Sequence, residues 1–301
     1  MKLALVTPSF SRDYPLCVEM CRSVDTYETD GMEHIVVVPR EDLGLFQPLA
    51  KGRRRVIAQE PHLPAMVRVP LPTVITLPGI GRKRLRKIWV TRRGQIVRGW
   101  IMQQLLKLSS DKMCDADGFV FTDSDVVFVR PFGHQTFVRD NRLALYHVPG
   151  ALDHSMTEHR RWQDVACALI GIPPFPFDGD NFIGSIVTWR RDRLCDLQSA
   201  IERVAGRDYV SALLGEKALS EYVVYGVFAT RVPGMDEGHF PLNQSLSHED
   251  WSYDLATADG RTAFENGLEP HHIAVLMQST NEWTMETRRE MIARITARVD
   301  A

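Results

Sequence analysis

Residues 118–131 read GFVFTDSDVVFVRP, and the interpretation of the chain starts from this stretch. Its apolar first part, residues 118–122, predicts a buried strand. Asp123 and Asp125 follow, and in an extended backbone they project to one side while Ser124 projects to the other. Two carboxylates at the end of a buried strand repel each other and are costly to bury, so a neutralising cation is expected. A hard divalent ion with phosphate oxygens in its shell suits such a pair.

The alternative for Asp-Ser-Asp is a solvated turn after a strand. Apolar residues flank the motif on both sides, at 119–121 and 126–129, which disfavours an exposed loop tip. Ligands of parallel sheets lie beyond the carboxyl ends of the strands, where this pair falls. The motif therefore predicts a binding site.

The chain before this motif has the pattern of a parallel sheet covered by helices. Residues 2–7 and 34–38 are apolar and predict buried strands, with a helix at 15–27 between them. Strand, helix, strand is the unit of such sheets. The clearest apolar stripe with helical spacing runs from Gln95 to about Met113. Residues 67–77 contain prolines, which confine that segment to an edge or a loop.

The second half continues the alternation. Strands are predicted at 126–129, 143–148 and 182–189, and helices at 159–170, 192–205, from Ser220, and at 288–299. The expected fold class is α/β, a mostly parallel sheet flanked by helices. No repeat or linker divides the chain, so one unit over 1–301 is expected.

The composition is that of an ordinary soluble globular protein. The 301 residues include 36 Lys and Arg, 38 Asp and Glu, and 44% apolar residues, which excludes disorder and fibrous repeats. The N-terminal apolar run is too short for a signal peptide, and no run approaches the about 20 residues that cross a bilayer. The five cysteines fit reduced thiols in a cytoplasm. Cys17 and Cys21 share a helix face, as small core residues or, alternatively, as a metal or redox pair.

Positive charge is concentrated in one segment. Residues 51–110 contain 14 Lys and Arg but one acidic residue, Glu60. A solvated basic face, attraction of an anionic substrate, and binding of nucleic acid or anionic lipid are the alternatives. Few aromatic residues are interleaved with the bases, so nucleic acid is not expected.

An ordered set of short motifs resembles a known family. TPSF at 7–10, GWIMQQLLKL at 99–108, FTDSDVVFVRPF at 121–132, SEYVVYG at 220–226 and HHIAVLMQS at 271–279 are similar to motifs of bacterial glycosyltransferase-like proteins with the GT-A fold. The similarity extends over about residues 1–280. It implies a nucleotide-binding half, 1–130, and an acceptor or sugar half, 131–301, within the single unit. It implies transfer of a sugar from a nucleoside-diphosphate donor to a hydroxyl acceptor, such as a glycan or glycolipid, in the cytoplasm. It also implies Mn2+ or Mg2+ as Lewis acid and template.

The resemblance assigns roles to residues near the metal and the nucleotide. Asp123 meets the ribose or the metal, Asp125 is the direct metal ligand, and either His271 or His272 completes the metal site. The resemblance also implies residues that contact the nucleoside, the diphosphate or another part of the donor. They are Thr7, Pro8, Ser9, Phe10, Asp13, Ser124, Gln278 and Ser279. The alternatives are an ordinary strand-to-helix turn for residues 7–13 and a structural or surface role for both histidines.

Further residues are implied for the sugar, the acceptor and the diphosphate. Asp180 and Asn181 contact sugar hydroxyls, and Gly184 lets the donor approach the main chain. Glu221 is the general base for an inverting reaction, with Ser220 as the N-cap of its helix. Arg98 and Lys107, on the helix before the Asp-Ser-Asp motif, pair with the diphosphate or, alternatively, are solvated. The basic run 82–93 is expected to close over the diphosphate or to meet an anionic acceptor, such as a lipid-linked sugar phosphate, with peripheral contact at the inner membrane face.

Two other functions compete with this one. A sugar-phosphate nucleotidyltransferase normally carries a Gly-rich basic loop after the first strand, and residues 7–14 contain no glycine. A noncatalytic carbohydrate-binding or scaffold protein with a degenerate transferase fold would lack metal-dependent donor hydrolysis. The sequence favours the enzyme.

Overall fold

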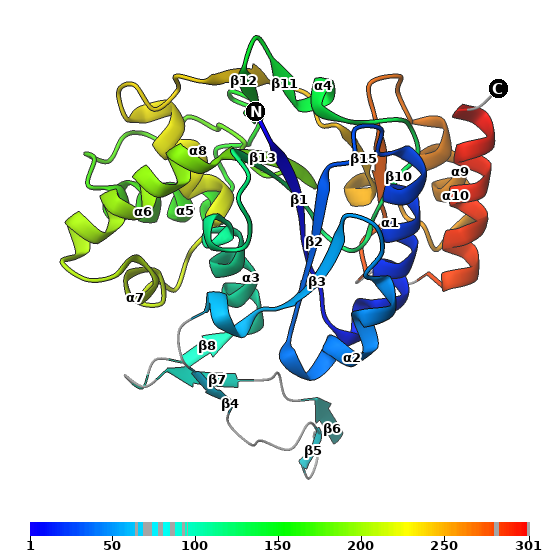
Figure 1. Ribbon diagram of the computed structural model, residues 1–301, viewed down its shortest axis with the longest axis horizontal. Helices are drawn as coiled ribbons and strands as arrows, with labels where there is room; N and C mark the ends of the chain where they lie inside the picture. Colours follow the sequence, from blue (N-terminus) through cyan, green and yellow to red (C-terminus); the bar gives the residue numbers. More distant parts are fainter. Residues whose placement is uncertain are drawn as a thin grey trace.

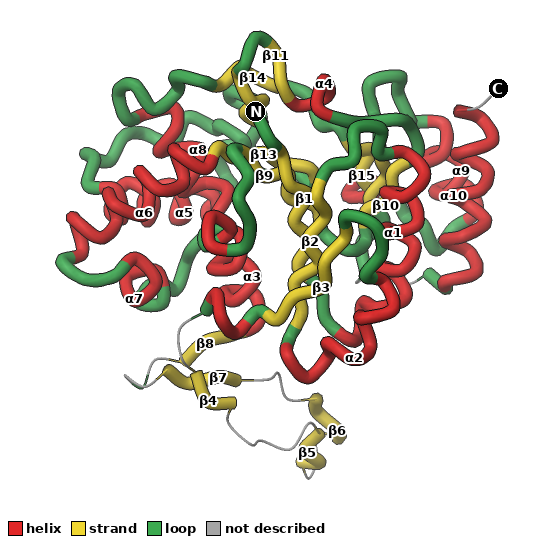
Figure 2. The backbone as a smooth tube through the Cα atoms, in the orientation of Figure 1, coloured by secondary structure: helices red, strands yellow, loops and turns green. Residues whose placement is uncertain are grey.

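A five-stranded sheet forms the centre of the molecule (Figures 1 and 2). The computed structural model describes residues 1–63, 66–68, 74–77, 81–84, 88–91, 94, 96–279 and 283–299. Strands lie in the order β13, β9, β1, β2, β3. They comprise β1 (Leu3–Pro8), β2 (Glu33–Val38), β3 (Arg54–Ala58), β9 (Gly118–Thr122) and β13 (Ile186–Arg190). All neighbours pair in parallel except β13, which is antiparallel to β9.

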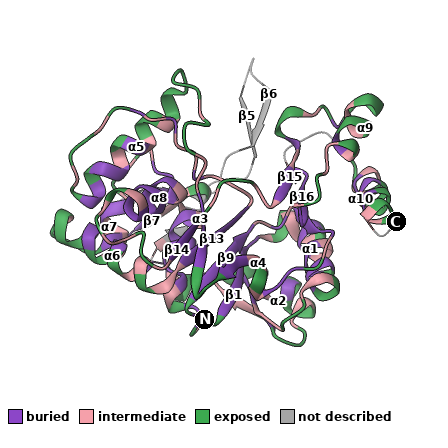
Figure 3. Cartoon of the chain, turned by 90° about the horizontal axis from the view of Figure 1, so that it is seen from above, coloured by how far each residue is buried: buried purple, intermediate pink, exposed green. Residues whose placement is uncertain are grey.

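Helices cover both faces of this sheet (Figure 1). Alternate strand residues face opposite sides, so Val36 and Val120 pack with α1 (Tyr14–Tyr27), whereas Val37 and Phe121 face the other side. That side carries α3 (Gly99–Lys107), α5 (Thr157–Ile170), α6 (Arg191–Ala205), α7 (Tyr209–Leu213) and α8 (Glu221–Arg231). The predicted class, α/β with a mostly parallel sheet flanked by helices, is confirmed. Figure 3 shows the buried strands between partly exposed helices.

A second sheet brings late segments of the chain to the Asp-Ser-Asp motif. Its order is β10, β16, β15, with β16 (Ala274–Leu276) antiparallel to β10 (Val126–Phe128) and parallel to β15 (Ser247–Glu249). α9 (Ala258–Asn266) and α10 (Met285–Val299) lie beyond it (Figure 1). Residues 126–129 therefore do not extend the central sheet.

Shorter elements complete the fold. β12 (Arg142–Tyr146) pairs with β11 (Val138–Arg139) and β14 (His239–Leu242), beside α4 (His134–Phe137), and α2 (Leu43–Phe46) precedes β3. β7 (Ile88–Thr91) pairs with β4 (Met66–Arg68) and β8 (Ile96–Arg98), and β5 (Val74–Leu77) pairs with β6 (Gly81–Arg84). Among the described helices, none is both long and apolar enough to cross a membrane.

Several predicted boundaries are wrong. The helix predicted from Gln95 begins at Gly99, because residues 96–98 pair with β7 as a strand. It ends at Lys107 instead of Met113, and a short 3-10 turn, Ser110–Lys112, follows. The strand predicted at 182–189 begins at Ile186. Most of the basic run 82–93 lies outside the residues whose side chains are described, so the structure does not test its predicted roles.

Candidate functional site

The Asp-Ser-Asp motif lies where the chain leaves the central sheet and enters the second one. Asp123 directly follows β9, and Asp125 directly precedes β10. The side chain of Asp123 is 47% exposed, and Asp125 is partly buried. Ser124 between them is buried, in agreement with its opposite orientation in extended chain. The pair is at the carboxyl end of a parallel strand, as predicted.

Asp125 is held by segments far away in the sequence. Its Oδ2 accepts a hydrogen bond from the backbone N–H of Ser279, 3.1 Å away. Its carbonyl oxygen accepts a hydrogen bond of 2.7 Å from the guanidinium of Arg288, on α10. Burial raises the pKa of Asp125 to about 6, and the nearby negative charge of Asp123 adds to the effect. The two carboxyl groups therefore interact unfavourably when both are ionised.

Lys107, at the end of α3, supplies a buried positive charge to this site. Its Nζ lies 3.3 Å from Oδ1 of Asp123 and 3.4 Å from Oε1 of Glu221. It also donates a hydrogen bond to the hydroxyl of Tyr222 and lies 4.5 Å from the centre of that ring. Burial lowers the pKa of Lys107, but Asp123, Tyr222 and Glu221 outweigh it and raise this pKa well above its usual value. The alternative prediction, that Lys107 is a solvated surface residue, is therefore wrong.

Glu221 begins α8, and the helix is capped as the sequence suggested. Ser220 is the N-cap, and its Oγ accepts a hydrogen bond of 3.4 Å from the N–H of Val223. Glu221 is only 6% exposed. Burial raises the pKa of its carboxyl group, and the ammonium of Lys107 partly offsets this. Glu221 thus meets a buried cation and not an open surface.

The loop after β1 contributes one acidic group to the site. Burial raises the pKa of Asp13, the charge of Arg12 counteracts this, and the charge of Asp123 adds to the rise. Thr7 is fully buried and bonds His34, which removes it from ligand contact. Pro8 is the last residue of β1 and is also buried, and Phe10 is half-buried.

Several buried polar atoms at this end of the sheet have no hydrogen-bond partner among the described residues. They belong to residues at the ends of β1 and β9, before β13, and on α3: Ser9, Thr122, Ser185 and Gln104. Because buried polar groups are nearly always paired, a group of them points to water or ligand atoms. Apart from Ser9, these residues and Tyr222 were missed by sequence reasoning, which had no local signal for them.

The predicted late histidine ligand is not near the carboxylates. Along β16, Leu276 pairs with Val126 and Ala274 with Phe128, so the histidines before Ala274 lie toward the end of β10 that is away from Asp125. His272 accepts a hydrogen bond of 2.9 Å from the N–H of Glu269 through Nδ1. Its neighbour, His271, has Nδ1 3.4 Å from the carboxylate of Glu269. Because β16 runs antiparallel to β10, the residues after β16 lie beside Asp125 and the residues before it do not. Ser279 therefore contacts Asp125, and the prediction of His271 or His272 as a metal ligand is wrong.

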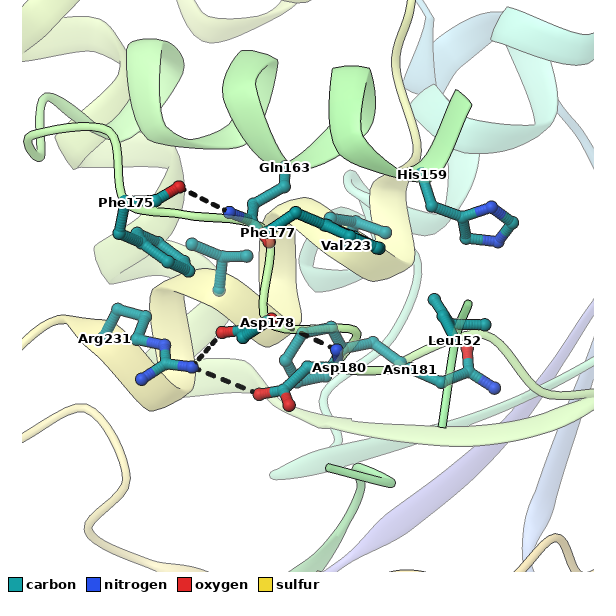
Figure 4. Close-up of a pocket in the computed structure, with 12 residues that line it drawn as sticks. Leu152, His159, Gln163, Phe175, Phe177, Asp178, Asp180, Asn181, Val223 and Arg231 are labelled. Carbon is teal, nitrogen blue, oxygen red and sulfur yellow. Dashed lines mark hydrogen bonds and ion pairs between the residues drawn. The ribbon is translucent and has the colours of Figure 1, made fainter. Parts of the chain in front are cut away.

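The segment predicted to meet the donor sugar is engaged within the protein. Oδ2 of Asp180 lies 2.7 Å from Nε2 of His147 and 3.2 Å from the guanidinium of Arg231. Figure 4 shows Arg231 directed at Asp180 and at Asp178, in a small pocket between α5 and α8. The side-chain oxygen of Asn181 accepts the N–H of Ile183 at 2.9 Å. These hydrogen bonds and ion pairs hold the loop that precedes β13.

Three further residues predicted to contact the donor lie in different parts of the structure. A Cβ on Gly184 would lie 3.3 Å from the ring of Tyr146, so this glycine makes room for a side chain of the protein. Gln278 donates from its backbone and its amide to Asp250, both at 3.0 Å. Arg98 ends β8, and its side chain is not among those described.

The residues around Asp125 fit a divalent cation in part. Within the described ranges, no group of three or more His, Cys, Asp or Glu side chains could hold a metal ion. Mg2+ is commonly held by one or two carboxylates together with phosphates and water. Burial is the main reason for the raised pKa of Asp125, and the charge of Asp123 adds to it, so a bound cation would stabilise the ionised carboxylate. Such a pair fits a metal whose other ligands come from a substrate.

The chain was compared with known proteins. No curated protein matches it. Among solved structures, an active-site mutant of LgtC is similar, with 12% identity, a TM-score of 0.48, and coverage of 98% of this chain and 95% of that one. The model of a family described as "Family of unknown function (DUF6492)" matches residues 1–299. The chain therefore belongs to this family.

Proposed function

We propose that the protein is a metal-dependent glycosyltransferase that uses a nucleoside-diphosphate sugar and a hydroxyl acceptor. The observation that carries the proposal is the carboxylate pair at the carboxyl end of β9, with Lys107 3.3 Å from Asp123. In open α/β sheets this is the place where ligands bind. Lys107, Glu221 and Ser279 come from three of the motifs that resemble GT-A glycosyltransferases, and they contact Asp123, Lys107 and Asp125 respectively.

The donor diphosphate is the group that this chemistry suits. A divalent cation held by Asp123 and Asp125 would compensate the charge of the diphosphate when bound. Lys107 keeps Asp123 in place and adds a fixed positive charge to the site, where electrostatic stabilisation of a leaving group is worth most. Asp13 and the unpaired hydroxyl of Ser9 are the proposed contacts of the nucleoside.

Glu221 takes a different role from the general base that the resemblance implies. Its carboxylate is buried and lies 3.4 Å from Lys107, so it is suited to hold that ammonium toward Asp123. We therefore treat Glu221 as a positioning residue. An acceptor base, if the reaction inverts, is to be sought among the exposed groups around Asp123.

Thermal-shift measurements with nucleoside diphosphates, with and without Mn2+, test the proposal. A ligand that binds only the folded state raises the melting temperature in proportion to its affinity and concentration. We expect at least one nucleoside diphosphate to stabilise the protein in the presence of Mn2+ and much less in its absence. No stabilisation by any of them would contradict the proposal.

Two variants separate an enzyme from a scaffold. Asp125→Asn should abolish the Mn2+-dependent shift and the slow hydrolysis of the donor. Asp115→Asn is the matched control, because Asp115 is exposed and precedes the same strand at its other end. A donor that binds equally well to both variants would favour the noncatalytic scaffold.

A further inference from the structure

Trp251 is the most exposed of the large hydrophobic side chains in the described part of the chain. Its exposed fraction is 67%, compared with 49% for Trp100. A single exposed apolar side chain is common on protein surfaces and identifies no site by itself. The position and the hydrogen bond of this indole are therefore what the inference depends on. Trp251 lies in a short 3-10 turn, Asp250–Ser252, directly after β15.

The indole is tied to the candidate site through Glu249. Nε1 of Trp251 donates a hydrogen bond of 2.7 Å to Oε2 of Glu249. The other oxygen of this carboxylate accepts the N–H of Ser185 at 3.1 Å. Ser185 directly precedes Ile186, which pairs with Thr122, and Asp123 directly follows Thr122. The carboxylate of Glu249 therefore links the exposed indole to the end of the β9–β13 pair, next to Asp123.

A second connection reaches Asp125. Asp250, next to Trp251, accepts hydrogen bonds of 3.0 Å from the backbone and the amide of Gln278. The following residue, Ser279, donates to Asp125. The turn that carries Trp251 is thus fixed to the segment that holds the second carboxylate of the motif. The two connections are independent, and both place the indole at the edge of the candidate site.

Polar groups that suit a sugar surround this indole. Glu249 accepts hydrogen bonds, and the hydroxyl of Ser245 lies 3.4 Å from its Oε1. Tyr146 lies close enough that the charge of Glu249 adds to the effect of burial, which raises the pKa of this tyrosine to about 12, so its hydroxyl remains a donor. A pyranose ring has an apolar C–H face and a rim of hydroxyl groups. A flat aromatic face beside hydrogen-bonding groups complements both parts.

We propose that Trp251 is the stacking platform for a sugar ring of the acceptor, with Glu249 binding its hydroxyl groups. The inference rests on the proposed function, since it assigns the acceptor class as a glycan that presents a pyranose ring beside Asp123. The hydrogen bond from Nε1 to Glu249 fixes the plane of the indole, which leaves its faces for contact.

Titration calorimetry with a panel of methyl pyranosides and short oligosaccharides tests this proposal. We expect the wild-type protein to bind at least one of these sugars, Trp251→Ala to bind it about tenfold more weakly, and Trp251→Phe to lose about threefold. Trp100→Ala is the matched control, because Trp100 is the other exposed tryptophan and lies on α3. Absence of sugar binding by the wild type, or equal binding by Trp251→Ala, would overturn the proposal.

Parallel measurements separate this inference from the proposed function. Stabilisation by a nucleoside diphosphate with Mn2+ in all variants, together with unchanged sugar binding in Trp251→Ala, would refute the platform alone. Sugar binding that depends on Trp251 without any nucleotide effect would refute the transferase and retain the platform. If Trp251→Ala converts an oligomer of the wild type to a monomer in sedimentation, Trp251 is a protein contact and the proposal fails.

Discussion

At the scale of single residues, the most consequential contact joins Lys107 to two acidic groups from different elements. Its ammonium lies between Asp123, after β9, and Glu221, at the start of α8. Buried ion pairs contribute little net stability when complete, but removing one partner leaves an uncompensated buried charge. This asymmetry gives a test of the arrangement.

Lys107→Met should reduce the free energy of unfolding by about 3–5 kcal/mol, because Glu221 then remains buried without its cation. The double variant Lys107→Met/Glu221→Gln should recover part of the loss, since the unpaired charge is gone. Urea denaturation of the wild type, both single variants and the double variant measures the coupling. Additive effects in this cycle would show that Lys107 and Glu221 do not interact.

His239 makes stability depend on pH. Burial lowers its pKa to about 4 in the folded protein, from 6.5 in the unfolded chain. Above pH 6.5 both states are neutral at this residue. As the pH falls toward 4, the unfolded state takes up a proton that the native state refuses, so the free energy of unfolding decreases, by up to about 3 kcal/mol.

His239→Gln isolates this contribution. Gln cannot titrate, and its amide can replace the bond of 3.0 Å between Nε2 of His239 and the hydroxyl of Tyr225. Urea midpoints measured between pH 7.5 and 4.5 should fall less steeply for His239→Gln than for the wild type. Identical slopes would mean that His239 is protonated in the native state as readily as in the unfolded chain.

At the scale of elements, α8 depends on a glycine for its closeness to the loop before β13. A Cβ on Gly226 would lie 2.2 Å from ring atoms of Phe182. Phe182 is buried, so its ring has little room to move. The first turn of α8 carries Glu221 and Tyr222, and any shift of the helix displaces the partners of Lys107.

Gly226→Ala should cost about 1–3 kcal/mol of stability through this overlap, although alanine is the better helix former. Gly44→Ala, in α2, is the matched control: no atom lies within 4 Å of its added Cβ, so it should be neutral or stabilising. Thermal unfolding of both variants decides the matter. Equal effects of the two substitutions on the melting temperature would show that the ring of Phe182 moves away from the added methyl group without loss of stability.

The sequence predicted those elements whose pattern is local. The first strands, the helix at 15–27 and the strand before Asp123 are short apolar runs or helical stripes with clear ends, and they occur in the structure. The start of α3 was missed because residues 96–98 have an apolar pattern that suits a helix, whereas pairing with β7 makes them a strand. Periodicity cannot report a partner strand.

At the scale of the whole molecule, the site depends on residues that are far apart in the sequence. The strand end and its carboxylates could be predicted, because a charged pair after a buried strand is anomalous in itself. Ser279 was expected at the donor, but its hydrogen bond to Asp125 could not be predicted, and neither could the positions of Arg288 and Trp251. These depend on the pairing of β16 and β15, which brings the chain back to β10. The same topology explains the wrong prediction for the histidines before β16.

Arg288 is the strongest example of this long-range dependence. Its side chain is fully buried on α10, 3.0 Å from the carboxylate of Glu19 on α1 and 2.7 Å from the carbonyl oxygen of Asp125. One guanidinium thus joins α1, α10 and the motif after β9. Burial lowers the pKa of Arg288, and Glu19 and Asp125 counteract the effect.

Arg288→Met should lower the free energy of unfolding by about 2–4 kcal/mol, because the carbonyl of Asp125 loses its donor and Glu19 keeps only the exposed Arg289, 2.6 Å away, as its cationic partner. Arg294→Met, on the same helix, should cost less than about 1 kcal/mol, since Arg294 is half exposed in its ion pair with Glu265. If α10 also fixes Asp125, Arg288→Met weakens the Mn2+-dependent binding of nucleoside diphosphate at temperatures where the variant is still folded, whereas Arg294→Met does not. Equal binding by the two folded variants would show that Arg288 contributes to stability only and that α10 does not position Asp125 for ligand binding.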